Sequence, residues 1–253
     1  MTKSNKASPA KKRAKAASPK PAAKARPITG KRASKSALPS AGRVREIFER
    51  FQAVNPEPKG ELEHVNPYTL LVAVVLSAQA TDAGVNKATR ALFAKADTPQ
   101  KMVALGEDAV RDHIKTIGLF RNKAKNVIAL SEQLIRDHGG KVPDNRDQLT
   151  ALPGVGRKTA NVVLNMAFGQ KTMAVDTHVF RVAHRLGLSH GANPETVEED
   201  LMRVVPDEYL FHAHHWLILH GRYTCLARGP KCAACPVADL CDSTDKILPG
   251  KAS

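Results

Sequence analysis

The segment LPGVGRKTANVVL, residues 152–164, decides the fold class of this chain because it joins a glycine-rich turn to a helical pattern. From Ala160 to Ala167 the apolar residues recur at intervals of three and four, which is typical of one face of an α-helix. The apolar residues from Val127 to Ile135 have a similar spacing and mark an earlier helix, which Gly139 and Gly140 end before the turn. The sequence therefore predicts two helices joined by a hairpin at residues 152–156.

The hairpin has the composition of a phosphate-binding site. Glycine tolerates positive φ and lets the backbone approach a ligand closely. The N–H groups of Gly154, Val155 and Gly156 would lie near the start of a helix that begins around Arg157, and free N–H groups at a helix start bind anions. Because Arg157 and Lys158 are both basic, we favour phosphate binding over a plain turn between two helices.

Two better-known glycine motifs are excluded. A P-loop requires glycine directly before its lysine, and Arg157 occupies that position. A dinucleotide-binding fingerprint requires a further glycine three residues after Gly156, where the chain has Thr159.

Most of the chain from Gly42 onward also has helical spacing. Residues 68–79 are apolar nearly all round, which indicates a buried helix, and Asp82 is predicted to cap the next helix, through Phe93. No segment alternates convincingly as a strand would, and aromatic residues make up only 4% of the chain. We therefore predict an all-α fold with about ten short helices.

Positive charge is concentrated at the start of the chain. The 253 residues carry a net charge of +15, and residues 1–40 contain 12 Lys or Arg and no Asp or Glu, which leaves +3 for the rest. We predict that residues 1–41 form a disordered basic tail, because they have too few apolar residues to fold. This tail would bind phosphates without sequence preference, or it is a solvated tail with no dedicated role; a targeting peptide or a nuclear signal at residues 11–13 is less favoured.

The apolar runs are too short to span a membrane, and no secretory signal is recognisable. We therefore expect neither an integral membrane protein nor a secreted one. The large positive charge favours nucleic acid or another anionic surface as the partner.

All four cysteines lie within seventeen residues, in the pattern C-x6-C-x2-C-x5-C formed by Cys225, Cys232, Cys235 and Cys241. Four thiolates at short range suit a tetrahedral zinc ion or an iron–sulfur cluster, and the spacing alone does not decide between them. Two disulfides would need an oxidising compartment. Arg228 and Lys231 lie between the cysteines, so a metal could hold a small basic loop in shape for DNA contact.

Lys158 and Asp176 are the candidate catalytic pair. Lys158 lies in the first turn after the hairpin, where the helix dipole and Arg157 disfavour a second positive charge and so favour a neutral, nucleophilic amine. For a single lysine, a phosphate contact is the ordinary alternative. Asp176 would act as a general base or stabilise a cation, and its ordinary alternative is the N-cap of the following helix.

Four segments together resemble the helix-hairpin-helix DNA glycosylases, and most closely the endonuclease III family among them. They are LSAQATD (residues 76–82), the hairpin and its helix (152–164), VDTH (175–178), and HHWLILHGRYTC (214–225) with the cysteine spacing. The resemblance covers about residues 43–245 and leaves the tail outside. Such enzymes remove oxidised pyrimidines from duplex DNA and then nick the abasic strand.

The resemblance implies a role for each candidate residue. Lys158 would attack C1′ of the damaged nucleoside and form an imine with the sugar, and β-elimination would then cleave the strand. Asp176 would assist deprotonation and stabilise positive charge at the sugar. Gln79 would fill the space that the extruded base leaves, and Leu119 would enter the opposite strand.

The resemblance also implies a [4Fe–4S] cluster on the four cysteines and a fold of two helical domains with a DNA cleft between them. Residues 60–170 would form a six-helix domain with the hairpin, and residues 42–59 with 171–246 would form the cluster domain. We expect a monomer that acts on duplex DNA with a damaged pyrimidine or an abasic site, in the bacterial cytoplasm, or in the nucleus if the source is eukaryotic. Gly229 follows Arg228 where a further basic residue often occurs, so the loop would bind DNA less tightly.

Two alternatives stay open at this point. An adenine-mismatch glycosylase would share the hairpin, the aspartate and the cluster, but it would lack a lysine at the position of Lys158. A non-catalytic DNA-binding helical module with a structural metal would share the composition without the chemistry.

Overall fold

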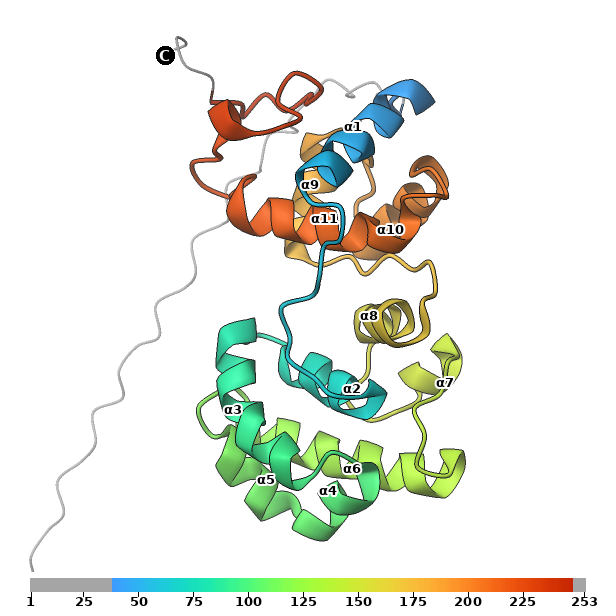
Figure 1. Ribbon diagram of the computed structural model, residues 1–253, viewed down its shortest axis with the longest axis vertical. Coiled ribbons are helices and arrows are strands. Elements are labelled where there is room, and N and C mark those ends of the chain that lie inside the picture. Colours follow the sequence, from blue (N-terminus) through green and yellow to red (C-terminus); the bar gives the residue numbers. More distant parts are fainter. Residues whose placement is uncertain (1–37, 248–253) are drawn as a thin grey trace, which may run out of the picture. The chain divides into compact units, whose positions relative to one another are not determined.

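The computed structural model describes residues 38–247, and in that range the regular secondary structure is all helical, with no β-strand (Figure 1). The predicted all-α class is confirmed. The elements are α1 (Ala41–Val54), α2 (Pro67–Leu76), α3 (Asp82–Lys95), α4 (Pro99–Leu105), α5 (Glu107–Ile114), α6 (Phe120–His138), α7 (Arg146–Thr150), α8 (Arg157–Phe168), α9 (Thr177–Arg185), α10 (Pro194–Val204), α11 (Leu210–Tyr223) and a short 3₁₀ helix, η1 (Cys232–Ala234).

Polar side chains mark most helix starts. The side chain of Asn66 accepts a hydrogen bond from the Thr69 N–H in a capping box, and Pro67 follows it as the first helical residue. The predicted cap at Asp82 is wrong by one residue: Thr81 caps α3 by accepting from the Gly84 N–H, and Asp82 is already helical. Threonine and aspartate both cap helices well, so the sequence does not distinguish them. From the first turn of α3, the negative charge of Asp82 interacts favourably with the helix dipole.

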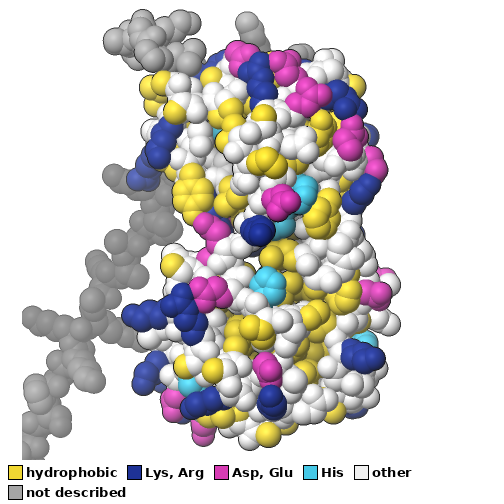
Figure 2. Space-filling model, viewed as in Figure 1, with side chains coloured by type: hydrophobic (Ala, Val, Ile, Leu, Met, Phe, Trp, Pro, Cys, Tyr) yellow, Lys and Arg dark blue, Asp and Glu magenta, His cyan; other side chains and the backbone are white. Residues whose placement is uncertain are grey.

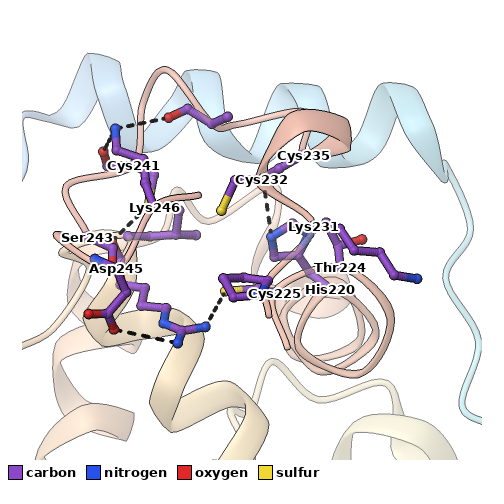
Figure 3. A pocket seen from close by; sticks show the side chains of 14 residues that line it. His220, Thr224, Cys225, Lys231, Cys232, Cys235, Cys241, Ser243, Asp245 and Lys246 are labelled. Atoms are coloured by element: carbon purple, nitrogen blue, oxygen red, sulfur yellow. Dashed lines mark hydrogen bonds and ion pairs between the residues drawn. The ribbon is translucent and has the colours of Figure 1, made fainter. Parts of the chain in front are cut away.

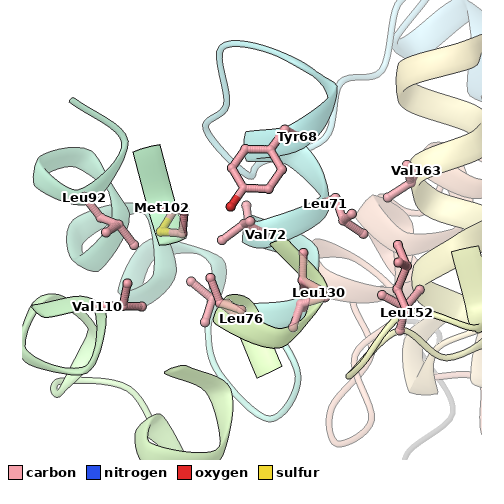
Figure 4. Close-up of a cluster of buried hydrophobic side chains, with 14 of the residues drawn as sticks. Tyr68, Leu71, Val72, Leu76, Leu92, Met102, Val110, Leu130, Leu152 and Val163 are labelled. Atoms are coloured by element: carbon pink, nitrogen blue, oxygen red, sulfur yellow. The ribbon is translucent and has the colours of Figure 1, made fainter. Parts of the chain in front are cut away.

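The first hydrophobic core surrounds α2, whose residues 68–76 are all buried. The buried helix predicted over residues 68–79 ends three residues early, at Leu76, and Ala78 and Gln79 are exposed in the turn that follows. Gln79 has positive φ, which a right-handed helix does not accommodate. Helix α2 packs against α3, α6 and α8. Figure 4 shows Leu71 and Leu76 of α2 among side chains from the surrounding helices, including Leu92, Leu130 and Val163. The core fixes α8, which follows the glycine hairpin.

The second hydrophobic core joins α1 to the C-terminal helices, although more than a hundred residues separate them in sequence. Phe48 of α1 stacks on Tyr209 with ring centroids 6.0 Å apart, and the indole N–H of Trp216 donates to the Asn55 carbonyl at 2.8 Å. In Figure 1, α1 in blue lies beside α9, α10 and α11 in orange. This core fixes the start of α9, where Asp176 lies.

None of the helices between residues 38 and 247 combines the length and the apolar composition needed to cross a bilayer. Residues 1–37 of the predicted basic tail lie outside the described residues. Ser40, at the end of the predicted tail, caps α1.

Two buried histidines should make the fold sensitive to mild acid. Burial, followed by the neighbouring charges of His215 and Lys158, lowers the pKa of His214 to about 3, and burial followed by His212 lowers the pKa of His215 to about 4. The unfolded chain binds these protons near pH 6.5, whereas the folded chain binds them only at lower pH. The free energy of unfolding is therefore highest above pH 6.5 and falls as the pH decreases to about 4. A melting-temperature series from pH 7.5 to 4 should decline below about pH 6.5. Substituting the exposed His64 with Gln should leave the decline unchanged, and a flat series would contradict the expectation.

Candidate active site

A cavity of about 470 Å³ contains both candidate catalytic residues. Lys158 enters it from the first turn of α8, and Asp176 from the start of α9. The two therefore come from helices that belong to different hydrophobic cores. Figure 2 is viewed as Figure 1 and shows histidine, basic and acidic side chains close together at mid-height. In Figure 1, this height lies between α11 and α2.

The hairpin before Lys158 is a tight turn that ends in an uncapped helix. The Val155 N–H donates to the Leu152 carbonyl at 3.1 Å, and Gly154 has φ +78°, where a side chain is strained. A Cβ at Gly154 would also lie 2.9 Å from the Asn126 amide nitrogen. Gly156 is the N-cap of α8 and offers no capping side chain. Because the N–H of Val155 is used in the turn, it is not available to an anion, whereas the N–H groups of the first turn of α8 have no capping side chain.

The guanidinium of Arg157 is held by a carboxylate, although the side chain is 43% exposed. Its guanidinium forms a two-point contact with the Glu198 carboxylate of α10, with nitrogen–oxygen distances of 2.8 and 2.9 Å. Glu198 therefore largely compensates the charge of Arg157, which was expected to act on Lys158.

Asp176 is the N-cap of α9, as its ordinary interpretation predicted. One carboxylate oxygen, Oδ1, accepts from the N–H groups of His178 and Val179, both at 2.8 Å. The other oxygen, Oδ2, has no hydrogen bond within the described part of the chain. A single carboxylate can therefore cap a helix and still present an anionic oxygen to the cavity that Asp176 lines.

Gln79 and Leu119 share an unusual backbone conformation. Between residues 38 and 247 they are the only non-glycine residues with positive φ, at +54° and +58°. This region is costly for a residue with a side chain, so the loops hold both residues against their preference. A Cβ at Gly118 would lie 3.8 Å from the Gln79 carbonyl oxygen, so the two loops are neighbours. Gln79 lines the cavity, and Leu119 is 57% exposed.

The sequence pattern did not predict an ionic network that lies at the edge of the cavity. Arg222 of α11 pairs with Asp82 at 2.5 Å and also with Glu61, and Tyr223 donates to Glu61 as well. Asp82 and Glu61 are separated from Arg222 by 140 and 161 residues, so no local spacing reveals the contacts. The network ties the segment before α2 to the last helix of the second core.

The four cysteines line one pocket, remote in sequence from Lys158 (Figure 3). None forms a disulfide, and burial raises the pKa of Cys235 and of Cys241. Polar neighbours reach the sulfurs: the Arg185 guanidinium lies 3.5 Å from Cys225 Sγ, and the His220 ring nitrogen lies 3.6 Å from Cys235 Sγ. Across residues 38–247, no three His, Cys, Asp or Glu side chains stand close enough together to be a formed metal site.

The candidate residues thus fall into separate groups. The cavity brings together Lys158, Asp176 and Gln79, and Leu119 lies in the loop beside Gln79. Arg228 and Lys231 are exposed on the loop between the cysteines, where Gly229 has φ +61°. Neither of these two basic residues lines the cavity of Lys158.

Comparison with known proteins places these features in a family. Residues 72–207 match the family described as HhH-GPD superfamily base excision DNA repair protein. Endonuclease III of Rickettsia conorii is 58% identical over 199 residues, which cover 79% of this chain and 95% of the relative. Endonuclease III of Escherichia coli K12 is 54% identical over 202 residues, covering 80% and 96%.

A solved structure of a trapped covalent endonuclease III–DNA intermediate has a similar fold. Its TM-score to this chain is 0.76 at 45% sequence identity, and the match covers 81% of this chain and 97% of that one. The identity, the coverage and the fold agree, and the chain belongs to the endonuclease III family of helix-hairpin-helix base excision repair proteins.

Proposed function

We propose that this chain excises oxidised pyrimidines from duplex DNA and then cleaves the abasic strand. The observation that carries the proposal is that Lys158 and Asp176 line one cavity, each at the start of a helix. The related endonuclease III that was trapped as a covalent DNA intermediate supports a nucleophilic mechanism. A base inside a duplex must be rotated out before it can be attacked, and damaged bases cost less to unstack.

Lys158 is the proposed nucleophile. Its neutral Nζ attacks C1′ as the bond from C1′ to the base breaks, and the base leaves with the bonding electrons and takes up a proton. The sugar ring then opens to an imine between Nζ and C1′. Loss of a proton from C2′ breaks the bond from C3′ to its oxygen, which releases the 3′ phosphate ester.

Asp176 is the proposed electrostatic and proton-transfer partner. Its free oxygen stabilises positive charge at the sugar while the base leaves. It also accepts protons during imine formation. The two N–H groups at the start of α9 hold the carboxylate in place.

The DNA contacts form three groups. The hairpin residues Gly154, Val155 and Gly156 bring the uncapped start of α8 to a phosphate, and Arg157 adds its backbone N–H. Gln79 enters the space left by the rotated nucleotide, and Leu119 enters the opposite strand; the strained conformation and the exposure of Leu119 support this role. Arg228 and Lys231 contact phosphates on the cysteine loop.

We further propose that the four cysteines hold a [4Fe–4S] cluster. Four thiols around one pocket, with no other thiol in the chain, fit that donor set. A cluster bound there would fix the basic loop of residues 225–241 and would take no part in the lysine chemistry. The two hydrophobic cores support a division into a six-helix domain, residues 60–170, and a cluster domain, residues 42–59 with 171–246.

Metal analysis tests the cluster directly. The purified chain should be brown, with broad absorbance at about 400 nm. It should contain about four iron atoms and four sulfides per chain. Cys235→Ser should lose most of the iron, because one of four ligands is gone. Ser243→Ala, which changes a residue that lines the same pocket without a thiol, should keep it. A colourless chain with stoichiometric zinc would overturn the assignment.

The activity is tested on two duplexes with separate readouts. One contains an oxidised pyrimidine and reports base release; the other contains an abasic site and reports strand cleavage. The proposed function requires both. An adenine-mismatch glycosylase would not release the oxidised pyrimidine, and a non-catalytic module would bind both duplexes and leave them intact.

A further inference from the structure

Glu198 is a buried carboxylate that contacts both helices of the hairpin. It lies on α10 of the second core, and its side chain is only 7% exposed. Besides its two-point contact with Arg157, the carboxylate forms an ion pair with the Arg146 guanidinium, with a nitrogen–oxygen distance of 3.7 Å. Since Arg146 is the first residue of α7 and Arg157 the first of α8, one carboxylate holds the first residue of each helix that flanks the hairpin.

The burial of Glu198 makes this contact different from an ordinary surface ion pair. It is the least exposed of the side chains that form ion pairs between residues 38 and 247. A buried carboxylate is costly unless it is paired, and two parallel N–H···O bonds fix the guanidinium in one orientation. Arg157 is therefore held at Glu198, although it lies next to Lys158 at a predicted DNA surface.

The contact closes a ring of three packed helices, two of which, α8 and α9, carry the candidate catalytic residues at their starts. Lys158 follows Arg157 on α8, and Glu198 lies on α10, which packs against α9. The first turn of α9 is capped by Asp176. Glu198 thereby links the helix of the proposed nucleophile to the helix of the proposed carboxylate by a second route besides the chain itself.

We propose that Glu198 is a positioning residue: it fixes Lys158 opposite Asp176 and withholds the guanidinium of Arg157 from DNA phosphates. The proposal rests on the proposed function. The hairpin then binds phosphate through backbone N–H groups alone, and the positive charge of Arg157 serves the geometry of the cavity.

Glu198→Gln should produce two changes at once. Strand cleavage of abasic DNA in single turnover should slow about tenfold, because the start of α8 loses its anchor and small displacements of a reacting group are costly. Affinity for a duplex with an uncleavable abasic analogue should become more dependent on salt. If the released Arg157 reaches one phosphate, the slope of log K against log salt should steepen by about 0.9.

Glu199→Gln is the matched control, because it removes the same charge from the adjacent, exposed position of α10. It should change neither the cleavage rate nor the salt slope. If Glu198→Gln behaves like Glu199→Gln in both assays, the proposal is wrong.

Arg157→Gln provides a test on a residue that is 43% exposed and so tolerates change. Cleavage should slow as in Glu198→Gln, while the salt slope should stay at the native value because Arg157 does not touch phosphate. A slope shallower by about 0.9 would show that Arg157 contacts DNA and would overturn the proposal. A native chain that binds the analogue but never cleaves abasic DNA would instead refute the proposed function, and the salt slopes would still test whether Glu198 withholds Arg157.

Discussion

Replacing Lys158 with Ala should abolish the covalent adduct that borohydride traps on abasic-site DNA. Strand cleavage should fall at least about a thousandfold, because the substitution removes the amine that forms the imine. Borohydride reduces the imine between the Lys158 nitrogen and C1′ to a stable amine, so the adduct reports that bond and not mere binding. Denaturing electrophoresis of the trapped mixture measures it.

Lys125→Ala is the control for the loss of a positive charge, since Lys125 is exposed on α6 and does not line the cavity. It should form the adduct at native yield. Lys158→Ala should still bind a duplex with an uncleavable abasic analogue within a few-fold of the native affinity, because the N–H groups of the hairpin are unchanged. An adduct at full yield in Lys158→Ala would remove this lysine from the mechanism.

The local features of the fold were predictable because they depend on neighbouring residues. The buried helix follows from a run of apolar residues, although its predicted end at residue 79 lies three residues beyond the observed end at Leu76. The interpretation of Asp176 as a helix cap follows from its place before Thr177. The cysteine pocket follows from four thiols within seventeen residues, because a short segment brings its own side chains together.

Contacts between distant residues were not predictable in this way. Nothing near Arg157 indicates that Glu198, 41 residues later, holds its side chain. The pair forms only when α10 packs in the second core beside the hairpin. The network of Arg222 with Glu61 and Asp82 has the same origin.

The positive φ of Leu119 was also not predictable from the sequence pattern. Leucine rarely adopts positive φ, so the sequence favours no left-handed conformation at Leu119, and only the family resemblance drew attention to this residue. In the structure Leu119 is an exposed leucine in a strained loop conformation, a combination that is costly unless the loop holds it there.

Asp176→Asn should slow strand cleavage at least about a hundredfold while it preserves the fold. Asparagine caps helices about as well as aspartate, and its side-chain oxygen can still accept from the N–H groups of His178 and Val179. What the substitution removes is the negative charge and the proton-accepting oxygen beside the sugar. Single-turnover cleavage of abasic DNA, with the trapped adduct measured in parallel, reports the loss.

Asp176→Ala separates the two roles of the same carboxylate. It should slow cleavage to a similar extent and also lower the free energy of unfolding by about 1 kcal/mol, because the first turn of α9 loses its cap. Asn193→Ala is the matched control, since Asn193 caps α10 by accepting from the Thr196 N–H and does not line the cavity. It should cost similar stability and leave cleavage unchanged. If Asp176→Asn cleaved at the native rate, Asp176 would be a helix cap alone, and the cationic sugar would need another partner.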